Sequence, residues 1–141
     1  MSTPRRTVVG YVPGAWDMFH VGHLNVIRRA RAECDYLIVG VVTDEVLEKA
    51  KNKRPVVPHQ ERLEVVRSID LVDEAVTDLS SDKLVMWEKL RFDVIFKGDD
   101  WRGTPQGDRL EAAMRSVEVE VVYFPYTAHT SSTALRKLLV G

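Results

Sequence analysis

The feature that most constrains the fold is the continuous apolar run Tyr36–Val42 (YLIVGVV), which lies between two amphipathic stretches. A strand that is apolar on both faces is typical of a parallel sheet with helices packed on both sides. Further strand-like runs alternate with helix-like stretches along the rest of the chain. This alternation predicts βα units joined by right-handed crossovers, and hence an α/β fold with a central, mainly parallel sheet.

The pattern assigns strands and helices to defined segments. We expect strands at Thr7–Val12, Tyr36–Val42, Glu74–Thr77, Val94–Lys97 and Val119–Phe124. We expect helices at Val21–Ala32, Asp44–Ala50, Gln60–Ile69, Asp82–Leu90, Asp108–Ser116 and Ser132–Leu139, with Gly98–Gly107 as a loop. Ligands of open parallel sheets bind beyond the carboxyl ends of the strands. The segments that directly follow the strands are therefore the candidate sites.

Length and charge argue against several classes of protein. The chain has 141 residues, the size of one ordinary domain, so we expect residues 1–141 to form a single domain. The 20 Lys and Arg against 21 Asp and Glu, a net charge of -1, argue against a nucleic-acid partner, which selects for a basic excess. Cys34 is the single cysteine, and the sequence has neither a signal-peptide core nor an apolar run of about 20 residues. We expect a cytoplasmic protein that does not insert into membranes.

The segment after the first strand, Gly14–His23 (GAWDMFHVGH), has the residues best suited to chemistry. His20 and His23 are three residues apart at the start of a helix, so they share a face, and Gly22 leaves room for a ligand. A helix N-terminus attracts phosphate, and imidazoles there donate hydrogen bonds or, when protonated, neutralise charge. A zinc site needs three or four ligands, and Cys34 and the other histidines have no suitable spacing. A purely structural role of the two histidines also stays open.

Three further segments lie where a ligand of such a sheet binds. Lys49–Arg54 holds four cations and is either a solvated face or a phosphate-neutralising loop. Gly98–Trp101 (GDDW) offers carboxylates for hydroxyl groups and an aromatic wall, or it is an acidic turn with a packed tryptophan. Thr130–Thr133 (TSST) is suited to capping a helix and, with the same groups, to binding phosphate.

These motifs together resemble a known family. Gly14–His23 is similar to the G-T-F-D-x-x-H-x-G-H signature of the cytidylyltransferase-like nucleotidyltransferases, with its HxGH intact. Within that superfamily the chain most resembles the bacterial glycerol-3-phosphate cytidylyltransferases. The similarity runs from Val8 to about Leu139 and recurs in Thr43–Glu45, Gln60–Arg62, Val72–Glu74, Gly98–Trp101 and Ser131–Thr133.

The resemblance implies a Rossmann-like three-layer α/β/α sandwich. It implies the transfer of CMP from CTP to a small phosphorylated alcohol, first of all sn-glycerol 3-phosphate, giving CDP-glycerol and pyrophosphate. It also implies a homodimer, and Mg²⁺ bound with the triphosphate rather than at a metal site of the protein. The implied catalytic residues are His20, His23 and Lys51, with Lys53 as the alternative to Lys51. The implied nucleotide-binding residues are Gly14, Ala15, Trp16, Gly22, Ser131, Ser132 and Thr133, and the substrate-binding residues are Asp17, Lys51, Asp100 and Trp101.

Three places depart from the family pattern. Ala15 replaces a threonine, Asp70 replaces an arginine, and Tyr126–His129 replaces an Arg-Thr-Glu-Gly segment. Two expected basic residues are thus missing, and Arg67 and His129 are the neighbours that would substitute for them. The departures leave open an ATP donor, or an acceptor such as a heptose, ethanolamine or other polyol phosphate. A nucleotide-binding module without catalysis also remains an alternative.

Overall fold

The described strands form a parallel sheet in the order β3-β2-β1-β4-β5. The structure is a computed structural model, and it describes residues 6–125 and 138–139. Its strands are β1 (Val9–Gly14), β2 (Tyr36–Val42), β3 (Glu74–Asp78), β4 (Val94–Gly98) and β5 (Glu120–Phe124). The predicted central parallel sheet is therefore confirmed.

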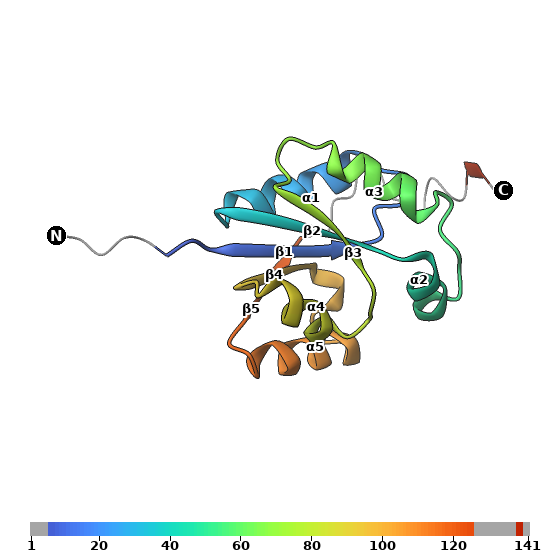
Figure 1. Cartoon of the computed structure of the whole chain (residues 1–141). Coiled ribbons are helices and arrows are strands. Elements are labelled where there is room, and N and C mark those ends of the chain that lie inside the picture. Colours follow the sequence, from blue (N-terminus) through green and yellow to red (C-terminus); the bar gives the residue numbers. More distant parts are fainter. Residues whose placement is uncertain (1–5, 126–137, 140–141) are drawn as a thin grey trace.

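Helices cover both faces of this sheet (Figure 1). On one face lie α1 (Val21–Ala32) and α3 (His59–Arg67), and on the other lie α4 (Lys83–Leu90) and α5 (Pro105–Arg115). The short helix α2 (Asp44–Lys51) follows β2 beyond its carboxyl end. This arrangement confirms the three-layer α/β/α fold.

The apolar run of β2 is explained by two hydrophobic cores, one on each side of the sheet. Leu37, Val39 and Val41 pack in the core that contains residues of α1 and α3. Ile38, which points the opposite way, packs with residues of α4 and α5. Because alternate side chains of a strand face opposite sides of the sheet, a strand covered on both faces must be apolar throughout.

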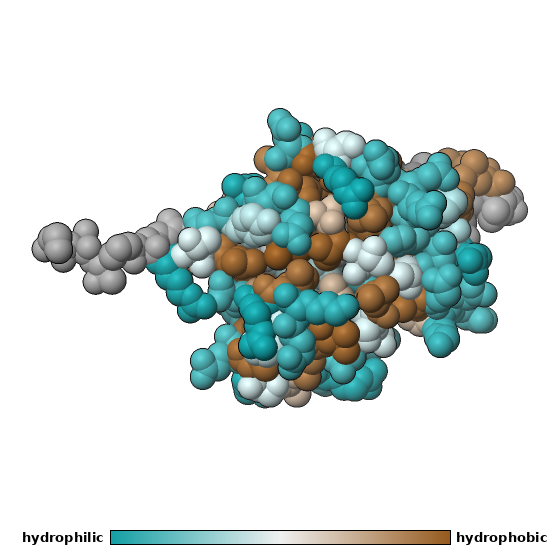
Figure 2. Space-filling model, in the orientation of Figure 1, coloured by the Kyte–Doolittle hydropathy of each residue, from teal (hydrophilic) through white to brown (hydrophobic). Residues whose placement is uncertain are grey.

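The surface follows the same layers. Figure 2 shows apolar side chains gathered in a band across the middle of one face, where the sheet reaches the surface between the two helical layers. Hydrophilic side chains cover most of the helical surface on either side of this band. Among the described residues, no helix is both long and apolar enough to cross a membrane.

Several element ends shift by one or two residues, and two of the differences from the sequence-based expectation lie at the carboxyl ends of strands. β1 ends at Gly14 rather than Val12, because Pro13 and Gly14 still align with Gly40 and Val41 of β2. The stretch Gly98–Gly107 is not all loop: Asp99–Trp101 forms a 3-10 turn, η1, and α5 begins at Pro105 rather than Asp108. Proline suits a first helical position because its missing N–H would have no partner there, and the Thr104 side chain caps the helix. Of the expected closing helix Ser132–Leu139, only Leu138 and Leu139 lie within the described residues, and both are helical.

The strand order sets where a ligand can bind. β1 and β4 are neighbours in the sheet, yet β1 leads into α1 on one face while β4 leads through η1 into α5 on the other. At such a switch point the connections leave in opposite directions and a crevice opens beyond the carboxyl ends of the strands.

Candidate active site

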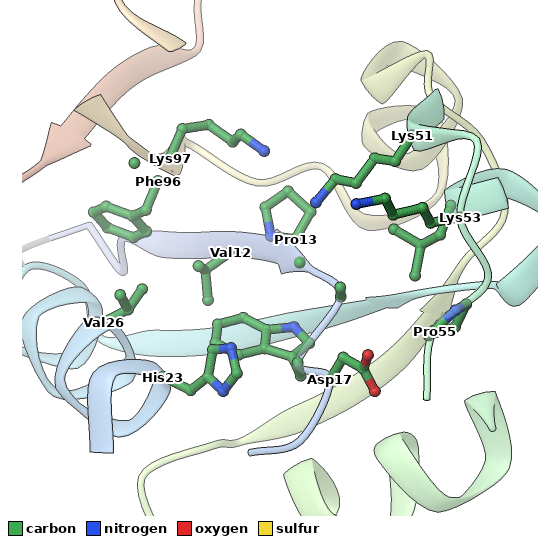
Figure 3. Close-up of a pocket in the computed structure, with 15 residues that line it drawn as sticks. Val12, Pro13, Asp17, His23, Val26, Lys51, Lys53, Pro55, Phe96 and Lys97 are labelled. Atoms are coloured by element: carbon green, nitrogen blue, oxygen red, sulfur yellow. The ribbon is translucent and has the colours of Figure 1, made fainter. Parts of the chain in front are cut away.

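A cavity of about 470 Å³ lies at this switch point. Its walls come from the ends of β1 and β4, from the first turns of α1, from α2 and from the loop after α2 (Figure 3). The lining residues are Val12, Pro13, Gly14, Ala15, Trp16, Asp17, His23, Val26, Leu47, Lys51, Lys53, Pro55, Phe96, Lys97 and Gly98. The cavity therefore unites the segments that follow the first, second and fourth expected strands.

The two histidines form the N-terminal cap of α1. The Gly22 amide donates to Nδ1 of His20 at 3.1 Å, and the His20 amide donates to Nδ1 of His23 at 3.2 Å. The two rings are stacked, with their centroids 3.9 Å apart. Because each Nδ1 accepts a hydrogen bond, a neutral ring carries its proton on Nε2. Both imidazoles thus present an Nε2–H donor, and the backbone fixes which nitrogen it is.

Burial disfavours the charged form of both rings. Burial, together with the adjacent His20 ring, lowers the pKa of His23 to about 4, while Asp17 acts in the opposite direction. Burial also lowers the pKa of His20. The sequence left open whether these rings act as cations or as neutral donors, and the pKa of His23 favours a neutral donor at that position in the free protein.

His23 lines the cavity, and the His20 ring, which is not among the lining residues, is stacked on the His23 ring. Nε2 of His20 is buried and has no hydrogen-bond partner among the described residues. A buried N–H without a partner costs free energy, so an acceptor oxygen brought to it by a ligand would be stabilising. The amide of Gly22, a residue expected to bind the nucleotide, donates to His20, and nucleotide binding at Gly22 stays a prediction.

Trp16 forms part of the cavity wall through an unusual turn. Trp16 and Met18 have φ angles of 57° and 49°, a region that large side chains rarely adopt. The indole is 5% exposed, and its Nε1 donates to the Gly40 carbonyl at 2.9 Å. A Cβ at Gly14 would lie 2.9 Å from this ring, so the ring can occupy its place because residue 14 is glycine. Trp16 therefore contributes its ring to the cavity wall, whereas its N–H is hydrogen-bonded to Gly40 and is not available to a ligand.

Asp17 anchors the loop that carries the cationic side chains. Its carboxylate accepts the amide N–H of Val56 at 2.9 Å and that of Val57 at 2.8 Å. Asp17 is 5% exposed, and among the described residues it is the one carboxylate that lines the cavity. Asp17 therefore has a structural role, because it holds the loop containing Lys53 and Pro55 against the segment that follows β1. Its substrate-binding role stays a prediction.

Arg62 of α3 joins the segment after β1, the end of β2 and the loop after α2, although the sequence indicated no role for it. It is 1% exposed and donates to the carbonyls of Ala15 at 2.7 Å, Val42 at 2.8 Å and Val57 at 2.8 Å. It also forms an ion pair of 2.5 Å with Asp44 at the start of α2. The motif Gln60–Arg62 was the one feature of the sequence that pointed to this arginine. Its burial becomes clear only once the positions of its carbonyl partners are known.

Three lysines provide the positive charge of the cavity. Lys51, at the end of α2, and Lys53, in the loop after it, extend into the cavity from one side. Lys97, in β4, extends into it from the other side (Figure 3). Sequence reasoning named Lys51 and Lys53 but missed Lys97, although it selected the segment that begins there.

The GDDW segment is arranged differently from the expectation. Asp100 is exposed and, like Trp101, is not among the described residues that line the cavity. The Trp101 ring instead packs against the Lys97 ammonium, with Nζ 3.9 Å from the ring centroid. Trp101 therefore contributes to the site indirectly, through the position of a cation.

Several sequence-based assignments fall elsewhere. Ser131, Ser132 and Thr133, like the segment 126–129 and with it His129, lie outside the described residues. Arg67 and Asp70 are exposed at and after the end of α3 and do not line the cavity. No cluster of three or more His, Cys, Asp and Glu that could hold a metal ion occurs within residues 6–125 and 138–139.

Known proteins resemble this chain over most of its length. It is 34% identical to glycerol-3-phosphate cytidylyltransferase of Bacillus spizizenii, over 88% of this chain and 91% of that protein. It is 37% identical to FAD synthase of Pyrococcus abyssi, over 86% of this chain and 80% of that protein. It is also 38% identical to ethanolamine-phosphate cytidylyltransferase of Arabidopsis thaliana over 73% of this chain, which spans 25% of that longer protein.

A solved structure supports the same fold. The lipopolysaccharide core biosynthesis protein from Thermoplasma volcanium superposes with a TM-score of 0.73 at 19% identity, over 89% of this chain and 100% of that chain. The cytidylyltransferase-like family model matches residues 11–138, which include the histidine cap, the three lysines, β4 and the end of β1 that borders the cavity. The chain belongs to the cytidylyltransferase-like family of nucleotidyltransferases.

Proposed function

We propose that this protein transfers CMP from CTP to a small phosphorylated alcohol, with sn-glycerol 3-phosphate as the first candidate. The observation that carries the proposal is the cavity in which three lysines and His23 surround one space at the switch point of the sheet. Such a surface suits two reactants that are both polyanionic. The relative from Bacillus spizizenii, named as a glycerol-3-phosphate cytidylyltransferase and matched over most of both chains, supports the choice of acceptor.

The proposed reaction is a direct displacement at phosphorus. A phosphate oxygen of the acceptor attacks the α-phosphorus of CTP, a new P–O bond forms, and the bond from the α-phosphorus to the bridging oxygen breaks. Pyrophosphate leaves with that oxygen, and CDP-glycerol is the product. The nucleophile is already an anion, so no protein group has to form a covalent intermediate. Catalysis then consists of positioning and of stabilising charge in the transition state.

Each residue has a defined part in this scheme. The Nε2–H groups of His20 and His23 donate to the oxygens of the α-phosphate and of the leaving pyrophosphate. Lys51 bridges the two phosphorylated reactants, with Lys53 beside it. Ser131–Thr133, from the family motif, hold the β- and γ-phosphates. Fixed donors of this type favour the transition state because they need no reorganisation while charge develops.

Magnesium is proposed to enter with the triphosphate. Phosphate oxygens are among the ligands that Mg²⁺ prefers, and the ion keeps several waters when it binds. Asp17 is the one carboxylate among the described lining residues, and it accepts backbone N–H groups. The phosphates rather than a protein ligand set would therefore hold the ion, which supplies further neutralisation of the triphosphate.

A second candidate is a transferase of the same family with another donor or acceptor. The ethanolamine-phosphate cytidylyltransferase and the FAD synthase, which are as similar to the chain as the glycerol-3-phosphate enzyme, favour this alternative. The substitutions Asp70 and Tyr126–His129 also fall where base selection would differ. A nucleotide-binding module without catalysis is the third candidate. Such a module needs affinity for the nucleotide but no groups that stabilise a transition state, so the intact pair His20 and His23 argues against it.

The decisive experiment is a matrix of donors and acceptors read by pyrophosphate release. CTP and ATP are each combined with glycerol 3-phosphate, ethanolamine phosphate, a heptose phosphate and FMN in the presence of Mg²⁺. The proposal predicts turnover with CTP and glycerol 3-phosphate at the highest kcat/KM. Faster turnover of another pair would reassign the substrates. Nucleotide binding by thermal shift without pyrophosphate release from any pair would favour the non-catalytic module.

We also propose a homodimer, as the resemblance to the family implies, with the Val72–Glu74 region near the interface. Light scattering behind a sizing column tests this directly. A mass close to twice that of the chain, 16.1 kDa, is expected, whereas a monomer at micromolar concentration would contradict it.

A further inference from the structure

The two walls of the cavity are not equivalent. Lys51 and Lys53 belong to α2 and its following loop, which Asp17 and Arg62 tie to β1. Lys97 belongs to β4, the neighbour of β1 on the other side of the switch point. Figure 3 shows the side chains of Lys51 and Lys97 extending into the space above Pro13 from opposite sides.

The Lys97 ammonium is held without a carboxylate partner. Among the described residues no Asp or Glu forms an ion pair with it, and its Nζ lies over the Trp101 ring, 3.9 Å from the ring centroid. A ring face attracts a cation but leaves the N–H donors free to bond elsewhere. The geometry thus keeps a charged donor directed at the cavity, without an ion-pair partner among residues 6–125 and 138–139.

The surroundings of Lys97 favour an anion at its tip. Burial, together with the positive charges of Lys83 and Lys51, lowers the pKa of Lys97 to about 8, while Asp100 and Asp78 act in the opposite direction. Lys83 is itself paired with Asp78 at 3.0 Å, so the charge of that aspartate is already shared. A phosphoryl oxygen bound to Nζ would remove the desolvation cost of this ammonium and raise its pKa again.

We propose that Lys97 is a third phosphate-binding residue, which binds phosphoryl oxygens of a reactant from the β4 side, opposite Lys51 and Lys53, and that Trp101 is the residue that positions it. The inference rests on the proposed function, because it assigns Lys97 to the same pair of phosphorylated reactants. It differs from the sequence-based view of GDDW, since it makes Trp101 a support for the cation rather than a wall for the substrate.

The chemistry that Lys97 recognises has two sources in this reaction. It is a phosphoryl group with at least one full negative charge, and either the triphosphate of the donor or the monophosphate of the acceptor supplies it. Titrating CTP, pyrophosphate and glycerol 3-phosphate separately distinguishes the two. A loss confined to CTP and pyrophosphate assigns Lys97 to the donor, and a loss confined to glycerol 3-phosphate assigns it to the acceptor.

The test compares Lys97→Met with the control Lys89→Met by calorimetric titration of these three ligands with Mg²⁺ present. Lys89 lies in the last turn of α4, is exposed and does not line the cavity, so the control makes the same change of charge elsewhere. Lys97→Met should weaken binding of at least one ligand by about tenfold or more, and Lys89→Met should leave all three within about twofold. Trp101→Leu should weaken the same ligand by a smaller factor.

A pH series separates direct binding from a merely structural role. In the wild type, affinity for the affected ligand should fall between pH 7 and pH 9, as the Lys97 ammonium, with its pKa of about 8, loses its proton. In Lys97→Met this part of the decrease should be absent, while Lys89→Met should keep it. A variant that only loosened the fold would lower affinity at every pH without changing the shape of the profile.

The outcomes also separate this inference from the proposed function. If a folded Lys97→Met protein binds all three ligands as the wild type does, the inference is wrong while the transfer reaction stands. If the wild type binds phosphates through Lys97 but releases no pyrophosphate from any pair, the proposed function is wrong while the inference stands. If the wild type binds none of the three ligands, both are wrong.

Discussion

At the start of α1, the imidazoles of His20 and His23 take the capping role that Ser or Asp usually has. Each Nδ1 accepts a backbone N–H, so each neutral ring carries its proton on Nε2. The cap therefore determines the tautomer and the direction of two donors at once. This explains physically why an HxGH sequence suits phosphoryl chemistry: the histidine spacing that caps the helix is also the spacing that orients both Nε2–H groups.

Removal of either imidazole tests the role of these donors. His20→Ala and His23→Ala should each lower the kcat for pyrophosphate release by about a hundredfold or more, because a fixed donor to the transition state is lost. The control is Arg29→Ala, an exposed position of the same helix, which should keep the wild-type rate. A near-normal kcat in either histidine variant would contradict the role of that residue.

The buried state of His23 also predicts how stability depends on pH. Its folded pKa of about 4 lies below its usual value of 6.5, so the unfolded chain binds the proton first as pH falls. The free energy of unfolding should therefore decrease between about pH 7 and pH 4, with about 2 kcal/mol of this loss from His23 by pH 5. Urea unfolding of the wild type and of His23→Gln at pH 7 and pH 5 measures it. An equal decrease in both proteins would show that His23 does not contribute.

At the scale of the elements, the cavity depends on loops whose positions are fixed by side-chain hydrogen bonds rather than by the backbone pairing of the sheet. Arg62 joins the segment after β1, the end of β2 and the loop after α2 through three carbonyl oxygens and Asp44. Asp17 completes this arrangement by accepting the N–H groups of Val56 and Val57. Because Lys51 and Lys53 flank or belong to these segments, the buried network positions the cations without contacting a ligand.

Arg62→Leu should be strongly destabilising, since it leaves Asp44 and three buried or partly buried carbonyl groups without their donor. Loss of one partner of a buried ion pair typically costs about 3–5 kcal/mol. The matched control is Arg67→Leu on the same helix, where the side chain is exposed and the change should stay within about 0.5 kcal/mol. Denaturant unfolding of both variants provides the comparison, and equal stability of the two would contradict the anchoring role of Arg62.

At the scale of the whole molecule, the sheet and its layers could be predicted from the sequence. The apolar run Tyr36–Val42 required helices on both faces of the sheet. The alternation of strands and helices required right-handed crossovers between parallel strands. The clustering of Gly14–Asp17, His23 and Lys51 also followed, because parallel strands end at the same edge. The start of α5 did not follow, since the cap at Thr104 was read as part of a loop.

What could not be predicted depends on tertiary direction. Lys97 is the last residue of the strand-like run Val94–Lys97, and the run does not indicate where its side chain points. The structure shows that the side chain extends into the cavity and that its Nζ packs against Trp101. Arg62 resembles any surface arginine of an amphipathic helix until its three carbonyl partners are placed. The neutral state of His23 likewise follows from burial, which a residue pattern does not contain. These features join segments that are distant in sequence.

In the proposed reaction a phosphate oxygen of the acceptor attacks the α-phosphorus of CTP within this cavity. Glycerol 3-phosphate whose phosphate oxygens carry a heavy isotope tests this step, with phosphorus NMR of the products. Direct transfer should give CDP-glycerol in which the α-phosphorus shows the isotope shift of one labelled bridging oxygen, together with unlabelled pyrophosphate. Label in the pyrophosphate, or CDP-glycerol without that shift, would contradict direct transfer, and no CDP-glycerol at all would contradict the proposed substrates.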